Sequence, residues 1–384
     1  MRMTIASGLA EVPPNDWDAL AQGRSPFLRH AFLKAMEDSG SVGQGTGWQP
    51  LPILVHDGDE LVGALPAYVK SHSYGEYIFD WGWAEGAQRA GLPYYPKLVV
   101  AVPFTPATGR RILIKEGRDE VAAPLLHGVR QAAEQLGLSG VHFLFTDEAD
   151  QKLLLEAGFE PRLTMQYHWR NLGEWRSWDD FLGALKSKRR REIRRERKLV
   201  REAGIDVRVE AGEDLGDAEW AAVWDFYRDT TSRKWGQAYL TEGFFERLRS
   251  DFADVVRLVV ARKDGEIVAG ALNFVGDGAM YGRYWGCRES HKQLHFETCY
   301  YAAIEHCLEH GYTLYEAGAQ GEHKIARGFL PQGMRSAHWI RHPGLGGAIA
   351  DFLADERKHN EHVLAALTER KSPFAALPAP PDPA

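Results

Sequence analysis

The chain contains an internal duplication, and this feature restricts its possible folds more than any other. Two shorter blocks recur in the same order in both halves: an Asp-Gly pair followed by Gly-Ala-Leu, from Asp57 and Asp264, and a Trp-Gly pair, from Trp81 and Trp285. A longer block recurs with a constant spacing of 170 residues: Gly158, Phe159, Pro161, His168 and Trp169 correspond to Gly328, Phe329, Pro331, His338 and Trp339. Three blocks in one order predict two copies of one folding unit.

Each half shows the same succession of local patterns. Apolar runs flank each Asp-Gly pair, which predicts a β-hairpin, and the Trp-Gly pair follows on a further strand. Residues 121–136 and 299–310 have helical apolar spacing and end at Gly137 and Gly311. A short apolar strand, a short helix and a last strand follow. This order predicts an α/β (α+β) fold in which each copy has a mixed central sheet flanked by helices.

The duplication also sets the expected domain boundaries. We expect a first domain over residues 1–170, a linker with a basic helix over 171–210, and a second domain over 211–345. A helix is expected in 346–376, followed by a disordered proline-rich tail over 377–384. In the linker, Ser177 is expected to cap one helix and Ser187 the next.

The basic helix has the most concentrated charge in the chain. Residues 186–201 hold ten basic and two acidic side chains, a net of +8, whereas the whole chain carries −7. Such a run repels itself in a helix unless an anion offsets it. Lys188, Arg190 and Arg194 are the expected anion-binding residues. No aromatic residue lies among the basic ones, so a nucleic acid would be contacted at its backbone. A solvated helix face is the alternative interpretation.

Composition excludes several classes of protein. Hydrophobic residues make up 44% and charged residues 26% of the chain, as in a folded globular protein. No apolar run approaches the ~20 residues of a membrane span, and the N-terminal residues have no signal-like apolar core, so we expect a cytoplasmic protein. Three cysteines without a Cys-x-x-Cys pair, and histidines without a His-Glu-x-x-His motif, lead us to expect no metal site.

Several segments resemble a known family. They are Ser187-Lys188-x-Arg190-x2-Ile193-Arg194, Tyr94-Tyr95-Pro96-Lys97, Phe104-Thr105-Pro106-x-Thr108-Gly109-Arg110-Arg111, Leu294-His295-Phe296-Glu297, and the Gly318–Pro331 segment. The chain resembles the FemAB-like, peptidoglycan biosynthesis or recognition branch of the GNAT acyltransferase superfamily, and also the Fem-type aminoacyl-tRNA-dependent transferases. The resemblance implies tandem GNAT-like domains, the first degenerate and on the acceptor side, the second catalytic.

The implied reaction is transfer of an acyl or aminoacyl group to a primary amine, by direct attack in a ternary complex. The acceptor would be an amine such as that of a cell-wall precursor, and no cofactor would be tightly bound. The donor would be aminoacyl-tRNA or acyl-CoA. GNAT enzymes that use acetyl-CoA have a glycine-rich turn before the central helix, whereas here no glycine follows Gly286 up to Gln293. This departure favours aminoacyl-tRNA.

One charged cluster is the expected catalytic site. Glu322 or His323 would serve as base, and Lys324 and Arg327, three residues apart, would hold an anionic donor group. At a spacing of 170, the first half has Lys152, Leu153, Leu154 and Ala157 instead, so the fold itself does not require these charges. A solvated helix start is the alternative. Glu297 is the second candidate base, with a helix-capping role as its alternative.

The loop over residues 91–111 interrupts the first copy with prolines, aromatic residues and basic residues. It is expected to line an acceptor-binding cleft, and a packed loop between domains is the alternative. The candidate acceptor-binding residues are Tyr94, Tyr95, Lys97, Arg110 and Arg111. His168 and His338, which occur in both copies, are expected to be structural.

Two rival functions remain open at this level. The first is an acyl-CoA-dependent N-acetyltransferase with a non-standard CoA pocket. The second is a module without enzymatic activity that binds tRNA or a cell-wall precursor. The charged cluster occurs in only one copy, which argues against a pure binding repeat.

Overall fold

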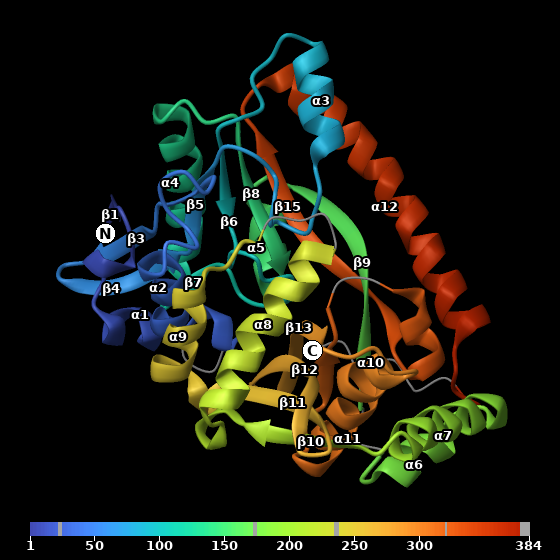
Figure 1. Ribbon diagram of the computed structural model, residues 1–384. Coiled ribbons are helices and arrows are strands. Elements are labelled where there is room, and N and C mark those ends of the chain that lie inside the picture. The colour runs from blue at the N-terminus through green and yellow to red at the C-terminus, as the bar shows by residue number, and fades with distance from the viewer. Residues whose placement is uncertain (22–24, 172–174, 234–237, 319–320, 377–384) are drawn as a thin grey trace. The chain divides into compact units, whose positions relative to one another are not determined.

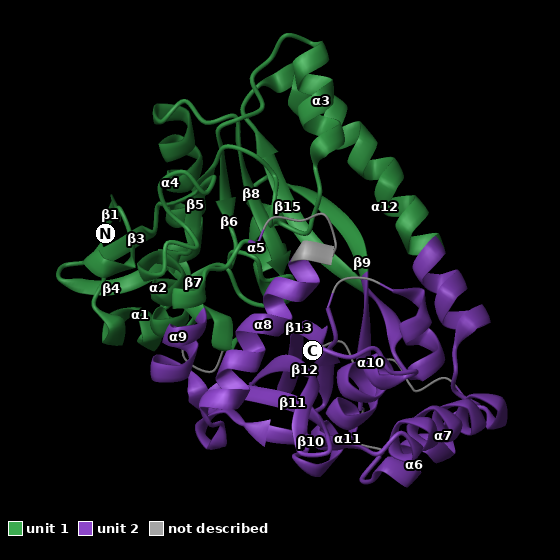
Figure 2. Cartoon of the chain, viewed as in Figure 1, with its two compact units in different colours: residues 1–165, 239–244, 333–362 green, residues 166–238, 245–332, 363–384 purple. Residues whose placement is uncertain are grey.

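The computed structural model describes residues 1–21, 25–171, 175–233, 238–318 and 321–376, and the predicted disordered tail lies outside them (Figure 1). The chain forms two compact units (Figure 2). The first comprises residues 1–165, 239–244 and 333–362, and the second comprises residues 166–238, 245–332 and 363–384. Among the described residues, no helix has the length and apolar character that crossing a membrane requires.

The first unit contains two groups of paired strands. One is a four-stranded sheet in the order β1-β3-β4-β7: β1 Arg2–Ile5, β3 Ile53–Asp57, β4 Glu60–Leu65 and β7 Leu113–Ile114. The other runs β15-β8-β6-β5-β2, with β15 Leu330–Ile340, β8 Gly140–Thr146, β6 Lys97–Val100, β5 Ala67–Lys70 and β2 Trp48–Pro50. The helices are α1 Pro14–Ala21, α2 His30–Asp38, α3 Trp81–Arg89, α4 Ala122–Gln135, α5 Glu148–Glu156 and most of α12 Pro343–Lys371.

The second unit has strands in the order β10-β11-β12-β13-β14-β9. Their bounds are β10 Ile205–Ala211, β11 Val256–Lys263, β12 Glu266–Gly276, β13 Ala279–Cys287, β14 Leu314–Glu316 and β9 Glu160–Arg170. The helices are α6 Trp178–Ala184, α7 Ser187–Glu202, α8 Asp217–Arg233, α9 Glu242–Asp251, α10 Leu294–Phe296 and α11 Ala302–Glu309. A π-helical segment, Glu297–Tyr301, leads into α11, and a 3-10 helix, η7, spans Glu322–Arg327.

The two units repeat one connectivity, which confirms the predicted tandem α/β fold. In the first unit, β5 pairs antiparallel with β6 and β6 pairs parallel with β8. In the second, β12 pairs antiparallel with β13 and β13 pairs parallel with β14. A helix precedes the parallel strand in both cases, α4 in one and α11 in the other, and the helices end before Gly137 and Gly311 with φ of 71° and 69°. These left-handed glycines end the helices as the sequence predicted.

The last residues of each half of the sequence lie in the compact unit that is formed mainly by the other half. Trp169 of β9 opposes Tyr315 of β14 in the second unit. Trp339 of β15 opposes Val141 of β8 in the first unit. The compact units are therefore built from several chain segments, whereas the boundaries expected from the sequence describe continuous domains.

The match of Trp81-Gly82 with Trp285-Gly286 was wrong. Trp285 lies in β13, but Trp81 begins helix α3, which is inserted between β5 and β6. The helix forms because Trp83 and Ala87, four residues apart, face one core together with Ile349 and Leu353. The true counterpart of β13 is β6, which carries Lys97.

Candidate functional site

In the second unit, two parallel strands separate after a short paired stretch, and we call the place where they separate the opening. β13 and β14 pair over only three positions, from Ala279 opposite Leu314 to Tyr281 opposite Glu316. At the next position the two backbones are still close together. A Cβ added to Gly282 would lie only 3.4 Å from the Ala317 Cα. β13 continues to Cys287, whereas the chain after Glu316 leaves the sheet towards η7. The strands thus separate where the charged cluster begins.

Lys324 is buried at this opening. Its side chain comes from η7, and its Nζ donates a hydrogen bond of 2.6 Å to the carbonyl oxygen of Gly318, two residues beyond β14. His168 of β9 is buried nearby, with its Nδ1 3.9 Å from the Glu316 carboxylate. Burial, and then the charges of Arg170 and Lys324, lower the pKa of His168 to about 3. The opening therefore contains a buried cation, a carboxylate and a neutral imidazole.

His323 and Glu322 lie at the exposed start of η7. The Nε2 of His323 is 2.8 Å from the Tyr300 hydroxyl, and its ring packs near Phe296 and Tyr300. Partial burial, Arg327 and Lys324 lower the pKa of His323, which keeps its imidazole neutral at neutral pH. Glu322 is exposed and forms an ion pair of 2.8 Å with Lys371 of α12.

Arg327 and Glu297, two further predicted site residues, are engaged with α7. Arg327 Nη2 lies 2.9 and 3.1 Å from the two carboxylate oxygens of Glu196, and its guanidinium lies 3.3 Å from the ring centroid of Phe296. Glu297 is buried in the π-helical segment and accepts hydrogen bonds of 3.0 and 3.2 Å from Arg197 Nε. Burial raises the pKa of Glu297 in spite of Arg197. Both residues hold α7 against the site.

α7 has an inner and an outer side. Ile193, Glu196 and Val200 are buried. Six basic residues of α7 are exposed, and we call the first five of them the basic face: Lys188, Arg191, Arg194, Arg195 and Lys198, with Arg201 in the last turn as the sixth. Arg190 is half-buried and points a guanidinium N–H at the Gly183 carbonyl oxygen over 3.4 Å. Ser187 is the first helical residue and not the cap, a position that Lys186 occupies without a side-chain hydrogen bond.

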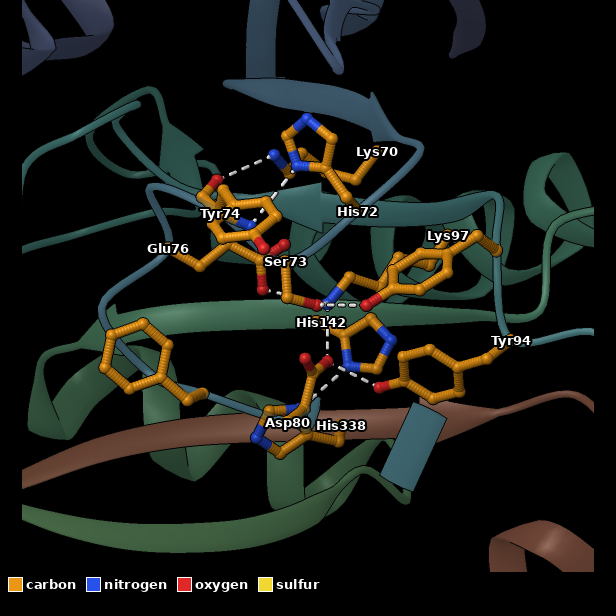
Figure 3. A network of polar contacts seen from close by, with 12 residues as sticks. Lys70, His72, Ser73, Tyr74, Glu76, Asp80, Tyr94, Lys97, His142 and His338 are labelled. Carbon is orange, nitrogen blue, oxygen red and sulfur yellow. Dashed lines mark hydrogen bonds and ion pairs between the residues drawn. The ribbon is translucent and has the colours of Figure 1, made fainter. Parts of the chain in front are cut away.

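The first unit contains a buried polar network centred on Lys97 of β6 (Figure 3). Lys97 Nζ donates hydrogen bonds to the Ser73 hydroxyl at 2.9 Å, to Glu76 Oε2 at 2.8 Å, and to Asp80. The Tyr94 hydroxyl also donates to Asp80. One further oxygen on each carboxylate, Glu76 Oε1 and Asp80 Oδ1, is buried with no hydrogen-bond donor among the described residues. An ammonium thus faces two carboxylates in a buried setting.

Two groups of this network titrate near neutral pH. Burial raises the pKa of Glu76 to about 7, even though Lys97 opposes that shift. Burial likewise lowers the pKa of Lys70, the cross-strand partner of Lys97, to about 7. Burial acts against ionisation of Asp80 as well, but the charge of Lys97 outweighs it and holds the Asp80 pKa well below its ordinary value. Groups poised in this way are typical of functional sites.

A pocket of about 760 Å³ lies beside the network. Its wall is formed by α3 and the following loop, from Trp81, Ala84, Glu85, Gln88 and the segment 91–95. The hydroxyl of Tyr95, which lines the pocket, lies 2.7 Å from the Ser73 hydroxyl and so joins the wall to the network. The volume falls in the range of small-molecule sites.

The two arginines of the same loop are occupied within the first unit. Arg110 Nε lies 3.0 Å from the Asp150 carboxylate. Arg111 is buried and donates hydrogen bonds to the carbonyl oxygens of Leu144 at 2.9 Å and Ala107 at 2.6 Å. These contacts brace the loop. Of the predicted acceptor residues, the structure brings Tyr94, Tyr95 and Lys97 together and keeps Arg110 and Arg111 apart from them.

The family and structural comparisons agree with this architecture. The family model described as peptidoglycan biosynthesis/recognition, FemAB-like, matches residues 8–376. No curated protein matches the chain in sequence. The solved structure of FemX is similar with a TM-score of 0.56 and 13% identity, covering 91% of this chain and 100% of FemX. That of L-PGS from Bacillus licheniformis has a TM-score of 0.52 and 13% identity, covering 90% and 98%. These likenesses are to the fold, and the tandem α/β architecture expected from the sequence is confirmed.

Proposed function

The chain belongs to the FemAB-like family of peptidoglycan biosynthesis and recognition, and from this membership we propose that it is a transferase that moves an acyl or aminoacyl group to a primary amine. The observation that carries the proposal is the opening between β13 and β14, where the ammonium of Lys324 is held at Gly318. An amine that attacks an ester or thioester carbonyl produces an oxyanion. A buried positive charge that is already fixed in place stabilises such a charge far more than water does.

We assign the proton transfer to His323. Its imidazole is neutral, it is exposed at the start of η7, and the Tyr300 hydroxyl orients it over 2.8 Å. In the proposed step the amine nitrogen bonds to the carbonyl carbon and His323 accepts an amine proton. The bond between the carbonyl carbon and the leaving oxygen or sulfur then breaks, and that atom leaves with a proton returned by His323. No covalent enzyme intermediate is needed.

Aminoacyl-tRNA is the donor that the turn before the central helix favours. In GNAT folds this turn faces the phosphates of CoA. Here it carries Glu289, which lies 3.0 Å from His291 in a turn without glycine after Gly286. A carboxylate at this place repels a pyrophosphate, and side chains replace the close backbone approach that glycine allows. The pocket beside Tyr94 and Tyr95 in the first unit is the proposed binding site for part of the amine acceptor.

A transfer assay tests the proposal. The purified chain is incubated with tRNA charged with radioactive amino acids, or with radioactive acetyl-CoA, and with a lysine-containing muropeptide precursor as amine acceptor. We expect label on the amine with the charged tRNA. Lys324→Met, which keeps the buried aliphatic stem, should lower the rate by ~10²-fold or more. Lys152→Ala, in the corresponding segment of the first half, is the matched control and should leave the rate unchanged.

Three outcomes separate the interpretations. Label that passes only from acetyl-CoA supports the CoA-dependent alternative. A Lys324→Met chain that keeps its melting temperature and full activity contradicts the placement of the reaction at this opening. A chain that binds tRNA or precursor but transfers from neither donor is the non-enzymatic module.

A further inference from the structure

The C-terminal end of α11 carries three metal-ligating side chains outside the proposed catalytic opening. His306, Glu309 and His310 occupy positions i, i+3 and i+4, which lie on one face of a helix. Each offers one ligand atom, and these atoms lie within 4.8 Å of one another. The sequence-based expectation of no metal site considered His-Glu-x-x-His but passed over this His-x-x-Glu-His order.

The buried side chain of His306 has a ring nitrogen that is available to a metal ion. It is 8% exposed, and its Nε2 is buried without a hydrogen-bond partner among the described residues. A metal ion is bound by an imidazole nitrogen that carries no proton, and burial of the ring disfavours the charged form of the imidazole. A buried polar atom without a partner destabilises the fold unless a ligand satisfies it.

His310 is oriented by its own helix. Its Nδ1 lies 2.9 Å from the carbonyl oxygen of His306. A carbonyl oxygen only accepts hydrogen bonds, so Nδ1 carries a hydrogen and Nε2 is the ring nitrogen that can face a metal ion. Metal-binding histidines are typically fixed by such a bond from the other ring nitrogen. The rings of His306 and His310 lie 3.9 Å apart between centroids, with the carboxylate of Glu309 beside them.

We infer that His306, Glu309 and His310 form a binding site for one divalent transition-metal ion of the zinc class. Two imidazoles and a carboxylate are a ligand set that Zn²⁺ uses, and they leave a fourth position to water. The three ligand atoms lie within 4.8 Å of one another, and two of the side chains, Glu309 and His310, are exposed. Arg257 is a cation near His306, and the carboxylate of Glu309 is a group of opposite charge type in the same site. This inference is independent of the proposed transferase activity.

Metal binding to the full-length, tag-free chain tests the inference. The protein is treated with a chelator, dialysed against ZnCl₂, and the bound zinc is measured by elemental analysis. One ion per chain is expected, together with a rise in melting temperature on addition of Zn²⁺. Co²⁺ in place of Zn²⁺ should give the visible absorption of a four-coordinate site.

Two surface variants and one control decide the result. His310→Gln and Glu309→Gln alter exposed side chains, so the fold should survive, and each should lose the tight zinc and the rise in melting temperature. His127→Gln removes an exposed histidine of α4 in the first unit and should retain both. Equal binding by His310→Gln and His127→Gln overturns the site. So does zinc that binds without raising the melting temperature of the unaltered chain.

Discussion

At the scale of single residues, the most unusual feature is the pair of lysines that face each other across β5 and β6. Lys70 and Lys97 are register partners, and both side chains are buried. Lys97 is compensated by Glu76 and Asp80, whereas Lys70 donates to the Tyr74 carbonyl oxygen at 3.0 Å and lies 3.8 Å from the ring centroid of Trp48. Burying an incompletely paired charge costs several kcal/mol. The free energy of unfolding should therefore depend on the pH at which Lys70 gains or loses its proton.

We predict that Lys70 makes the protein more stable as the pH rises from 7 to about 10. Its pKa is about 7 in the folded chain, below the ordinary 10.5, so in this window the unfolded chain holds the additional proton. The free energy of unfolding should then rise by up to about 1.4 kcal/mol per pH unit. Lys70→Met should remove this slope and gain stability relative to the wild type at pH 7. Urea unfolding of both proteins at several pH values measures it, and parallel curves would contradict the shift.

The residues of the candidate sites were predictable only in part, for a physical reason. The loop with Tyr94, Tyr95 and Lys97 could be recognised from its composition. Its partners Glu76 and Asp80 lie about twenty residues earlier, in a segment whose apolar residues show no periodicity. Likewise the cluster at Lys324 was found because its charges are missing from the first copy. The ion pair between Arg327 of this cluster and Glu196 of α7 was not predicted, because no local pattern links residues so far apart in the sequence.

At the scale of elements, α7 is a helix docked by charge rather than by a broad apolar stripe. Its inner side is held to the rest of the second unit through Glu196 with Arg327 and through Arg197 with Glu297 and Glu305. This explains why its apolar residues are so sparse in the sequence. The charged residues on the inner side of α7 are thus paired within the second unit. The basic face remains exposed, with Lys188, Arg191, Arg194, Arg195 and Lys198.

We predict that the basic face binds a polyanion. Reversing Arg191 and Arg195 to Glu should abolish retention on immobilised tRNA and reduce the salt dependence of binding by about two units of slope, one per lost phosphate contact. Arg208→Glu, at an exposed arginine of β10 that pairs with Asp206, is the control and should change retention little. If the double variant is retained as strongly as the control at low salt, the basic face is only a solvated surface.

Helix and strand positions followed from local patterns wherever the period was clear. Residues 121–136 and the basic run 186–201 were predicted as helices and appear as α4 and α7. The error at Trp81 arose because a two-residue match carries no period. The amphipathic spacing of Trp83 and Ala87 was the better signal.

At the scale of the whole molecule, the exchange of last strands makes each unit depend on both halves of the sequence. The first unit includes Ala337 in its core, and Trp339 packs against that core. The second unit includes β9 residues 168–170 beside β14. Constant spacing in the sequence revealed two copies but not this exchange, because identical copies pack equally well with their own strand or with the other's.

We predict that neither half folds alone. A fragment of residues 1–171 would leave β8 without β15, and a fragment of residues 172–384 would leave β14 without β9. Each should be insoluble or lack a cooperative thermal transition, whereas both expressed together should form a soluble one-to-one complex. Circular dichroism and size-exclusion chromatography measure this. A first fragment that unfolds cooperatively on its own would contradict the reading of the exchange as essential.

The exchanged strands also bear on how such a chain could arise. Two separate copies of one half would complete each other only as a dimer, and their folding would weaken on dilution. Fusion of the two copies makes their association intramolecular. A short flexible connection gives each copy an effective concentration on the order of millimolar around the other. The fused chain becomes independent of its own abundance. It can then vary its two copies separately, as it has done where Leu153, Leu154 and Ala157 of the first copy correspond to His323, Lys324 and Arg327 of the second. It can no longer discard either copy.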